Sequence, residues 1–163
     1  QIGMLATVMN CIYVSEIFRS VGMKTKVLTP FACGAFTELF SKDLVNECFS
    51  KGMVTFYAGG TGHPYFSTDT GAALRAAEIG ADILLLAKNV DGIYDSDPKK
   101  NPAAKKIDRI SHMEFIQQDL RAMDATAVTI CMENKIPVLA FGLFEENSIV
   151  RAVEGQDIGT LIV

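Results

Sequence analysis

Histidine and cysteine are scarce in this chain, and their spacing forms no binding pattern. The two histidines are His63 and His112, and the four cysteines are Cys11, Cys33, Cys48 and Cys131. Because no C-x-x-C pair occurs, the sequence predicts neither a structural zinc site nor a disulfide framework. None of the thiols has a basic or histidine neighbour that would activate it, which is typical of small core residues. We therefore expect a reduced, cytoplasmic setting.

An excess of charge of one sign is also lacking. The chain has 15 Lys and Arg against 19 Asp and Glu, a formal net charge of -4, and neither sign forms a long run. A protein that binds nucleic acid usually carries a concentrated basic surface. Nucleic acid is therefore not an expected partner, and any anion must be held by local geometry.

The first apolar segment, residues 5–14, lacks the features of a targeting sequence. No basic n-region precedes it, and polar residues within and after it, such as Asn10 and Glu16, are too frequent for a membrane span of roughly 20 residues. The segment is apolar on nearly all sides, which predicts a buried helix that ends near Gly22. A buried helix needs a layer on each side. We therefore expect that the chain begins inside a domain whose N-terminal part is missing.

The remaining pattern indicates one globular domain over residues 1–163, because 49% of the residues are hydrophobic and 21% are charged. Apolar strands are predicted at 24–29, 53–58, 83–87, 138–141 and 160–163. Helices are predicted at 36–50, from the capping residues 67–69 to Ile79, at 124–134 and at 147–153. Ser111 and Glu114 predict the capping box of a further short helix. Strands that alternate with helices predict an α/β fold, a three-layer αβα sandwich with a mainly parallel sheet. Residues 89–107 carry turn signals and predict a long loop or a small hairpin.

The segment 58–69, with the sequence AGGTGHPYFSTD, is the most informative for chemistry. Its glycines follow a predicted strand, and Ser67, Thr68 and Asp69 stand where a helix begins. Glycines let a backbone approach an anion closely, and a helix N-terminus offers free N–H groups and a positive dipole end. A phosphate site is therefore predicted, although neither the Walker A nor the Rossmann pattern is present. The alternative is a glycine turn followed by an ordinary N-cap.

Residues 88–98 follow the next predicted strand, on the carboxyl edge where open α/β sheets bind ligands. Three carboxylates in this segment suggest calcium, but the EF-hand spacing fails. A turn with solvated acidic residues is the alternative. Asp124 at a helix start predicts an N-cap, and His63 is more typical of a hydrogen-bonding neighbour than of a catalyst.

Several segments together resemble the bacterial UMP kinases of the amino acid kinase family. They are residues 3–10 (GMLATVMN), 58–69 (AGGTGHPYFSTD), 72–79 (AALRAAEI), 90–98 (VDGIYDSDP), 123–124 (MD) and 159–160 (GT). The resemblance runs in order along nearly the whole chain. It implies the three-layer sandwich of that family and the transfer of the γ-phosphate of ATP to UMP, which gives UDP in pyrimidine nucleotide biosynthesis.

Carried over residue by residue, the resemblance assigns a substrate pocket, an ATP pocket and a catalytic group. The residues implied to bind UMP are Thr61, Gly62, His63, Pro64, Tyr65, Phe66, Ser67 and Thr68. Lys88 or Asn89 is implied to contact ATP, with Tyr94 near the adenine and Asp97 near the ribose. Asp124 is implied to be catalytic, because in this family it orients a lysine at the phosphates. The family's N-terminal lysine and glycine-rich loop have no counterpart in these residues, so we expect the chain alone to transfer phosphate poorly or not at all.

The resemblance also implies Mg²⁺ with ATP, since catalysis then depends on aligning two anions and neutralising their charge. It implies a hexamer built from dimers, in the cytoplasm, with GTP or UTP as an effector. Three alternatives stay open. A related kinase acting on a carboxylate or carbamate would want a dedicated Arg or Lys in its pocket. A non-catalytic nucleotide-binding domain and a purely structural subunit are the others.

Overall fold

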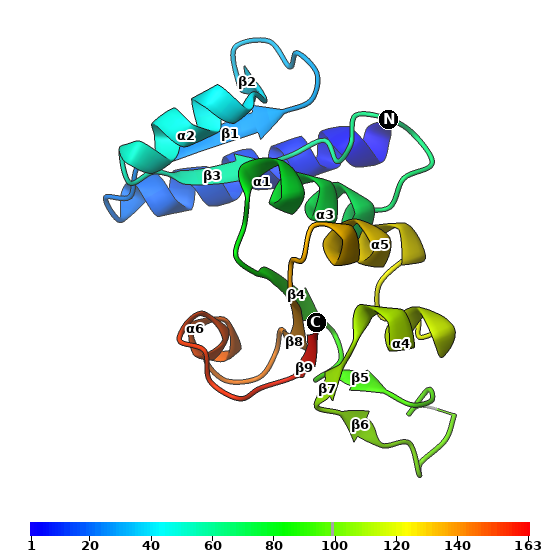
Figure 1. Cartoon of the computed structure of the whole chain (residues 1–163). Coiled ribbons are helices and arrows are strands. Elements are labelled where there is room, and N and C mark those ends of the chain that lie inside the picture. Colours follow the sequence, from blue (N-terminus) through cyan, green and yellow to red (C-terminus); the bar gives the residue numbers. More distant parts are fainter. Residues whose placement is uncertain (99) are drawn as a thin grey trace. The chain divides into compact units, whose positions relative to one another are not determined.

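The computed structural model describes residues 1–98 and 100–163, so Lys99 of the predicted 89–107 loop lies outside the described residues. The chain divides into two compact units, residues 1–79 and residues 80–163. Each unit is described by itself (Figure 1).

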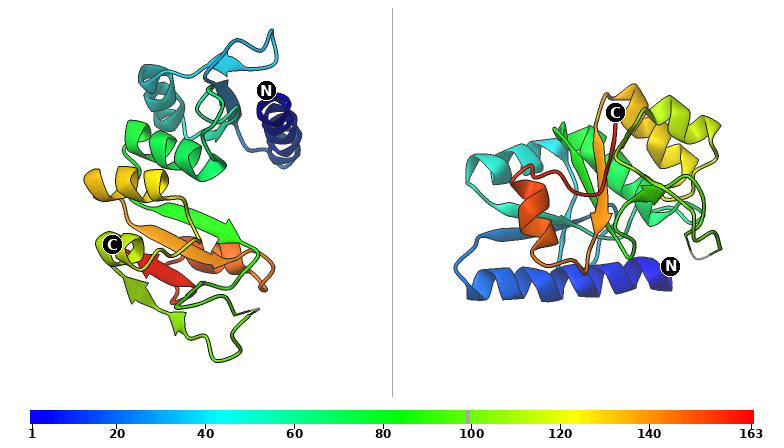
Figure 2. Two further views of the ribbon diagram at one scale, coloured as in Figure 1. Left: turned by 90° about the vertical axis from the view of Figure 1, so that its right-hand side faces the viewer. Right: turned by 90° about the horizontal axis from the view of Figure 1, so that it is seen from below.

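The first unit contains a small parallel sheet with helices on both of its faces. Its elements are α1 (Ile2–Ser20), β1 (Thr25–Thr29), β2 (Glu38–Leu39), α2 (Lys42–Ser50), β3 (Val54–Tyr57) and α3 (Thr68–Ile79). The strand order is β2-β1-β3, and both strand pairs are parallel. Figure 2 shows α1 on one face of this sheet and α2 on the other. Val8, Val27 and Ala58 form a buried cluster between α1 and the sheet.

The helix predicted near the N-terminus is confirmed as α1, but the prediction that it is buried is wrong. Only Val8 and Ser15 of α1 are buried, while Ile2 is 86% and Met9 72% exposed. The face toward β1 is partly polar, since Ser15 Oγ and Thr25 Oγ1 share a hydrogen bond of 2.7 Å. Much of the apolar surface of α1 therefore points away from the sheet. By length and composition alone α1 also fits a membrane-spanning helix, a weak criterion that core helices and signal sequences meet as well.

The second helix begins six residues later than the predicted 36–50, because the preceding residues pair with β1. The hydroxyl of the buried Thr29 is 2.8 Å from Thr37 Oγ1, and Phe40 N donates to Thr29 O at 2.9 Å. These bonds hold the segment extended. The helix α2 then begins after Ser41, whose Oγ accepts from Leu44 N at 3.3 Å, as expected for an N-cap.

The second unit contains a four-stranded sheet and a separate small hairpin. Its elements are β4 (Leu84–Lys88), β5 (Ile93–Tyr94), β6 (Lys106–Ile107), β7 (Arg109–Ile110), α4 (His112–Gln117), α5 (Ala125–Glu133), β8 (Val138–Gly142), α6 (Ser148–Val153) and β9 (Thr160–Ile162). The strand order is β4-β8-β9-β7, in which only the β8–β9 pair is antiparallel. The pairing of β5 with β6 confirms the hairpin alternative for residues 89–107. The short strand β7 was not predicted.

The helix cap of α4 and the cysteine environment in this unit agree with the sequence predictions. Glu114 N donates to Ser111 Oγ at 3.1 Å, and Ser111 N donates to Glu114 Oε2 at 3.0 Å, so the capping box of α4 is confirmed. Hydrogen bonds from Ser111 hold the pKa of the Glu114 carboxyl below its usual value. Burial raises the pKa of the Cys131 thiol to about 11, which suits a core residue and not a reactive one.

The predicted fold class is confirmed in each unit, where helices flank sheets whose strands are mainly parallel. In the second unit, the buried residues of β8 and α6 form one cluster: Leu139, Phe141, Ala152 and Ile158. Every residue of β8 is buried, which is typical of a strand covered on both faces.

Candidate functional site

A cavity in the first unit lies between the start of α1 and the loop after β3. Its volume is about 360 Å³, which is within the range of small-molecule sites. It is lined by Gln1, Gly3, Met4, Thr7, Gly59, Gly60, Thr61 and the run from His63 to Thr68. All the residues implied to bind UMP therefore line one cavity, except Gly62.

Residues 59–62, the glycine turn, follow β3 and begin the loop that leads to α3. Gly62 N donates to Gly59 O at 3.0 Å, and Gly59 has a φ of +82°, which favours glycine. A Cβ on Gly59 would lie 2.7 Å from Phe31 Cε1, so the turn packs closely against this ring. The strand-to-turn geometry predicted from the glycines is therefore present.

Gly60 and Thr61 of the glycine turn both line the cavity. Within the described part of the chain, no acceptor is found for the N–H of Gly60 or of Thr61. The first turn of α3 also reaches this cavity, through Thr68. Because N–H groups at a helix N-terminus have no partner in the helix, the α3 dipole and the glycine turn favour negative charge here.

The side chains of the loop after the glycine turn are held by short-range bonds. His63 N donates to Thr61 Oγ1 at 3.2 Å, and the Thr61 hydroxyl lies at the same distance from His63 O. Ser67 Oγ accepts from Thr70 N at 3.0 Å, so Ser67 is the residue that caps α3. Tyr65 is fully exposed and has a φ of +72°. Its ring is therefore presented at the rim and not packed in the core.

Sequence reasoning missed the residues that the start of the chain brings to this cavity, which are Gln1 and, in α1, Gly3, Met4 and Thr7. The Thr7 hydroxyl accepts from Gly59 N at 2.8 Å and donates to Met4 O at 2.7 Å. The segment 3–10 carried the family resemblance, but its residue types alone did not indicate a site. The contribution of α1 to the site is seen only in the hydrogen bond between Thr7 and Gly59, which are 52 positions apart in the sequence.

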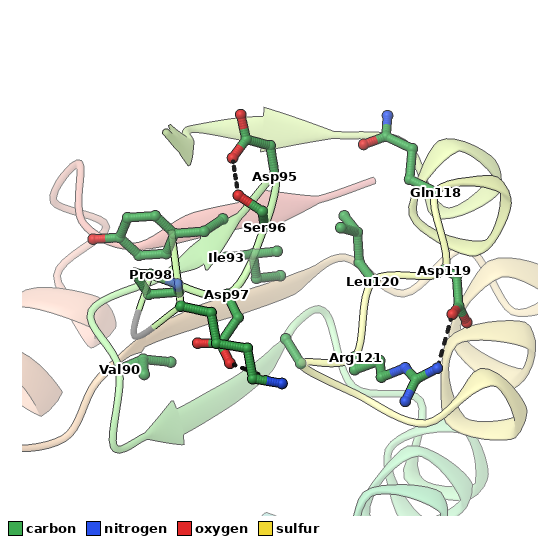
Figure 3. Close-up of a pocket in the computed structure, with 14 residues that line it drawn as sticks. Val90, Ile93, Asp95, Ser96, Asp97, Pro98, Gln118, Asp119, Leu120 and Arg121 are labelled. Atoms are coloured by element: carbon green, nitrogen blue, oxygen red, sulfur yellow. Dashed lines mark hydrogen bonds and ion pairs between the residues drawn. The ribbon is translucent and has the colours of Figure 1, made fainter. Parts of the chain in front are cut away.

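A second cavity, of about 510 Å³, lies in the second unit between the β5 hairpin and the loop after α4. Figure 3 shows Ile93, Asp97 and Pro98 on one side and residues 118–121 on the other. Tyr94 and Asp97, both implied to bind ATP, line it, whereas Lys88 and Asn89 do not. Lys88 ends β4 and Asn89 is exposed directly after it.

Two of the polar side chains that line this cavity have neighbours among the described residues. The Tyr94 hydroxyl donates to Asp91 Oδ1 at 2.9 Å, and this bond raises the pKa of Tyr94 above its usual value. Asp97 Oδ2 is 4.0 Å from Lys100 Nζ. Among the described residues, no group of three or more His, Cys, Asp or Glu is placed to hold a metal ion.

Residues 118–122 form the side of the second cavity that the sequence did not indicate. Arg121 Nη2 is 3.1 Å from Asp119 Oδ2, and both side chains are exposed. No motif marks this loop. It connects α4, which ends at Gln117, to α5, which begins at Ala125.

Asp124 is confirmed as the N-cap of α5, since its Oδ1 accepts from Ala127 N at 3.0 Å. Its side chain is half-buried, and it also has a contact beyond this bond. The catalytic role that the resemblance implies for Asp124 stays a prediction.

The cap function of Asp124 predicts a difference between two substitutions. Asp124→Ala removes the acceptor, and we expect a loss of about 1 kcal/mol in the free energy of unfolding. Asp124→Asn keeps an acceptor of equal quality, so we expect a change of only a few tenths of a kcal/mol. Urea unfolding followed by circular dichroism measures both, with Asp82→Ala as the control at an exposed carboxylate. Equal losses for the two Asp124 variants would mean that its charge, and not the cap, stabilises this region.

Comparison with known proteins gives a consistent result. A profile of the Amino acid kinase family matches residues 1–141. The chain is 47% identical over 161 residues to the chloroplastic uridylate kinase PUMPKIN of Arabidopsis thaliana, covering 99% of this chain and 48% of that protein. It is 43% identical over 162 residues to a uridylate kinase of Deinococcus radiodurans, covering 99% of this chain and 66% of that protein. The chain thus spans less than two thirds of the length of either relative.

A solved structure gives the same fold. The UMP kinase of Ureaplasma parvum superposes with a TM-score of 0.93 at 37% identity, over 99% of this chain and 69% of that one.

Proposed function

The chain belongs to the amino acid kinase family, and we propose that it provides the UMP and ATP sites of a UMP kinase. The reaction is the transfer of the γ-phosphate of ATP to UMP, which yields UDP and ADP. The relatives named above are uridylate kinases, and the structural neighbour is a UMP kinase. Because the chain spans only part of those proteins, its own activity is an inference.

The observation that carries this proposal is the cavity of the first unit. It combines the N–H groups of Gly60 and Thr61, which have no acceptor among the described residues, with the start of α3. Such a site suits a phosphate, whose oxygens accept several hydrogen bonds at once. No Lys or Arg occurs among the described residues that line it, so it lacks the dedicated cation that a carboxylate substrate would want.

ATP is assigned to the cavity of the second unit. Tyr94 and Asp97 line it, and their aromatic and carboxylate groups suit an adenine ring and a ribose. Mg²⁺ fits this chain as an ion carried by the nucleotide, because Mg²⁺ usually binds one or two carboxylates together with phosphates. Bound in that way, Mg²⁺ supplies charge neutralisation at the transferred phosphate. Lys88 or Asn89 as the ATP contact, Asp124 as the catalytic group, a cytoplasmic hexamer and a GTP or UTP effector stay predictions.

Calorimetric titration of the chain with UMP tests the proposal. We expect saturable binding that exceeds the binding of CMP, AMP and aspartate. A Thr61→Ala, Thr68→Ala double variant removes two hydroxyls that line the cavity. Its affinity for UMP should fall more than tenfold, because a hydrogen bond to a charged group contributes about 1.5–3 kcal/mol.

Thr129→Ala is the matched control, since the Thr129 hydroxyl donates to Ala125 O in α5 and lines neither cavity. We expect its UMP affinity to be unchanged. Binding of aspartate in preference to UMP would favour a kinase of the same family with a carboxylate substrate. No binding of any of these ligands to the folded chain would contradict the proposal.

A further inference from the structure

Thr7 is the one side chain of α1 whose hydroxyl is bonded to the glycine turn. It lies in the second turn of the helix, is half-buried and lines the cavity of the first unit. Its hydroxyl donates to Met4 O at 2.7 Å and accepts from Gly59 N at 2.8 Å. Both distances are typical of well-formed hydrogen bonds. The helix and the turn are therefore joined through a single oxygen atom.

The glycine turn is confined on its other sides by packing. Gly59 is buried, and the space beside its Cα is taken by the Phe31 ring, which a Cβ would approach to 2.7 Å. Gly62 lies against Pro30 in the same way, since a Cβ there would be 3.0 Å from Pro30 Cγ. These contacts restrict translation of the turn. The packing does not hold the peptide group between Ala58 and Gly59 against rotation. The hydrogen bond from Gly59 N to Thr7 Oγ1 does so.

We propose that Thr7 is a positioning residue for the anion site, because its hydroxyl fixes the direction of the N–H groups of Gly60 and Thr61. This role rests on the proposed function, in which these two N–H groups hold an oxyanion of UMP. Without the hydroxyl, the buried N–H of Gly59 has no acceptor, and such a group is strongly disfavoured. The peptide then rotates toward the cavity to find a partner. That rotation turns the next two N–H groups away from the anion.

A purely structural role is the competing explanation, in which Thr7 only ties α1 to the sheet. Other contacts already make that connection. Val8 is buried against Val27 and Ala58, and Ser15 and Arg19 bond to Thr25. Loss of one hydroxyl should therefore leave α1 in place. If Thr7 has a positioning role, loss of its hydroxyl weakens UMP binding. If its role is only structural, loss of the hydroxyl leaves UMP binding unchanged.

The test uses the whole chain with Thr7→Val, which has nearly the same shape without the hydroxyl, and Thr7→Ser, which keeps the hydroxyl. Calorimetry measures the dissociation constant of UMP. Hydrogen exchange followed by NMR measures the protection of the Gly60 and Thr61 amides at saturating UMP. We expect Thr7→Val to weaken UMP binding about tenfold and to lose the UMP-induced protection of both amides. Thr7→Ser should stay within about twofold of the unchanged chain, because its hydroxyl can make the same bonds.

Thr129→Val is the matched control, since it removes a threonine hydroxyl bonded to a helix carbonyl outside the site. If Thr7→Val does not fold, Thr7→Ala supplies the same comparison with a better helix former. If the unchanged chain binds UMP and the hydroxyl-free variant binds it equally well with both amides protected, the role of Thr7 is wrong and the proposed function stands. If the unchanged chain does not bind UMP, the proposed function and the role proposed for Thr7 are both wrong.

Discussion

Gly159→Ala is expected to lower the free energy of unfolding of the 80–163 unit by about 3 kcal/mol or more. Gly159 has a φ of +66°, and a Cβ there would lie 2.1 Å from Ala140 O and 2.9 Å from Phe141 Cα. These obstacles are backbone atoms of β8, where Ala140 pairs with Thr160 of β9. A backbone atom cannot move aside as a side chain can, so the strand pair itself must open.

Gly155→Ala separates this clash from the cost of the backbone conformation. Gly155 has a φ of +72°, but nothing lies within 4 Å of a Cβ at that position. The expected loss is therefore only about 1 kcal/mol, from the left-handed conformation alone. Urea unfolding of both variants, followed by far-ultraviolet circular dichroism, gives the difference. Equal losses would show that the β8–β9 pair adapts to the extra carbon.

Gly59→Ala is expected to reduce stability and UMP affinity together. A Cβ at Gly59 would combine a φ of +82° with a distance of 2.7 Å to the edge of the Phe31 ring. Because a ring can tilt, the loss of stability should be smaller than at Gly159, about 2 kcal/mol. Any shift of the glycine turn also moves the N–H groups of Gly60 and Thr61. We therefore expect UMP binding to weaken by more than tenfold, as for the loss of a bond to a charged group.

Gly52→Ala is the control for this prediction, since Gly52 has a φ of +64° and open space at the Cβ position. It follows α2 and lines neither cavity. Thermal unfolding and calorimetric titration with UMP should show a loss of stability without a loss of affinity. A Gly59 variant that binds UMP as tightly as the Gly52 variant would mean that the glycine turn does not contact the ligand.

Features that depend on neighbouring residues in the sequence were predicted correctly. The capping box of Ser111 and Glu114 and the cap at Asp124 need only three or four consecutive positions. The glycine turn likewise follows from the local sequence, because a positive φ is available mainly to glycine. The alternation of strands and helices was sufficient for the fold class.

Features that depend on distant contacts could not be predicted in the same way. The helix α2 begins late because Thr29 bonds to Thr37 and accepts from Phe40 N, and helical spacing in 36–50 contains no sign of that competition. The burial of α1 was predicted from apolar composition, but composition does not say which side faces the sheet. The contribution of Thr7 to the cavity needs the Gly59 contact, and residues 118–122 carry no motif at all.

The position of β9 in the second sheet has a consequence for biosynthesis. β9 lies between β8 and β7, although it follows both of them in the chain. While a ribosome is still adding residues before 160, β7 and β8 have no strand between them to pair with. The sheet can therefore close only after residues 160–162 have left the ribosome, so this unit cannot complete its folding before they are made. Until then the edges of β7 and β8 are open to wrong partners, which makes this interval the time when a chaperone would protect the unit most.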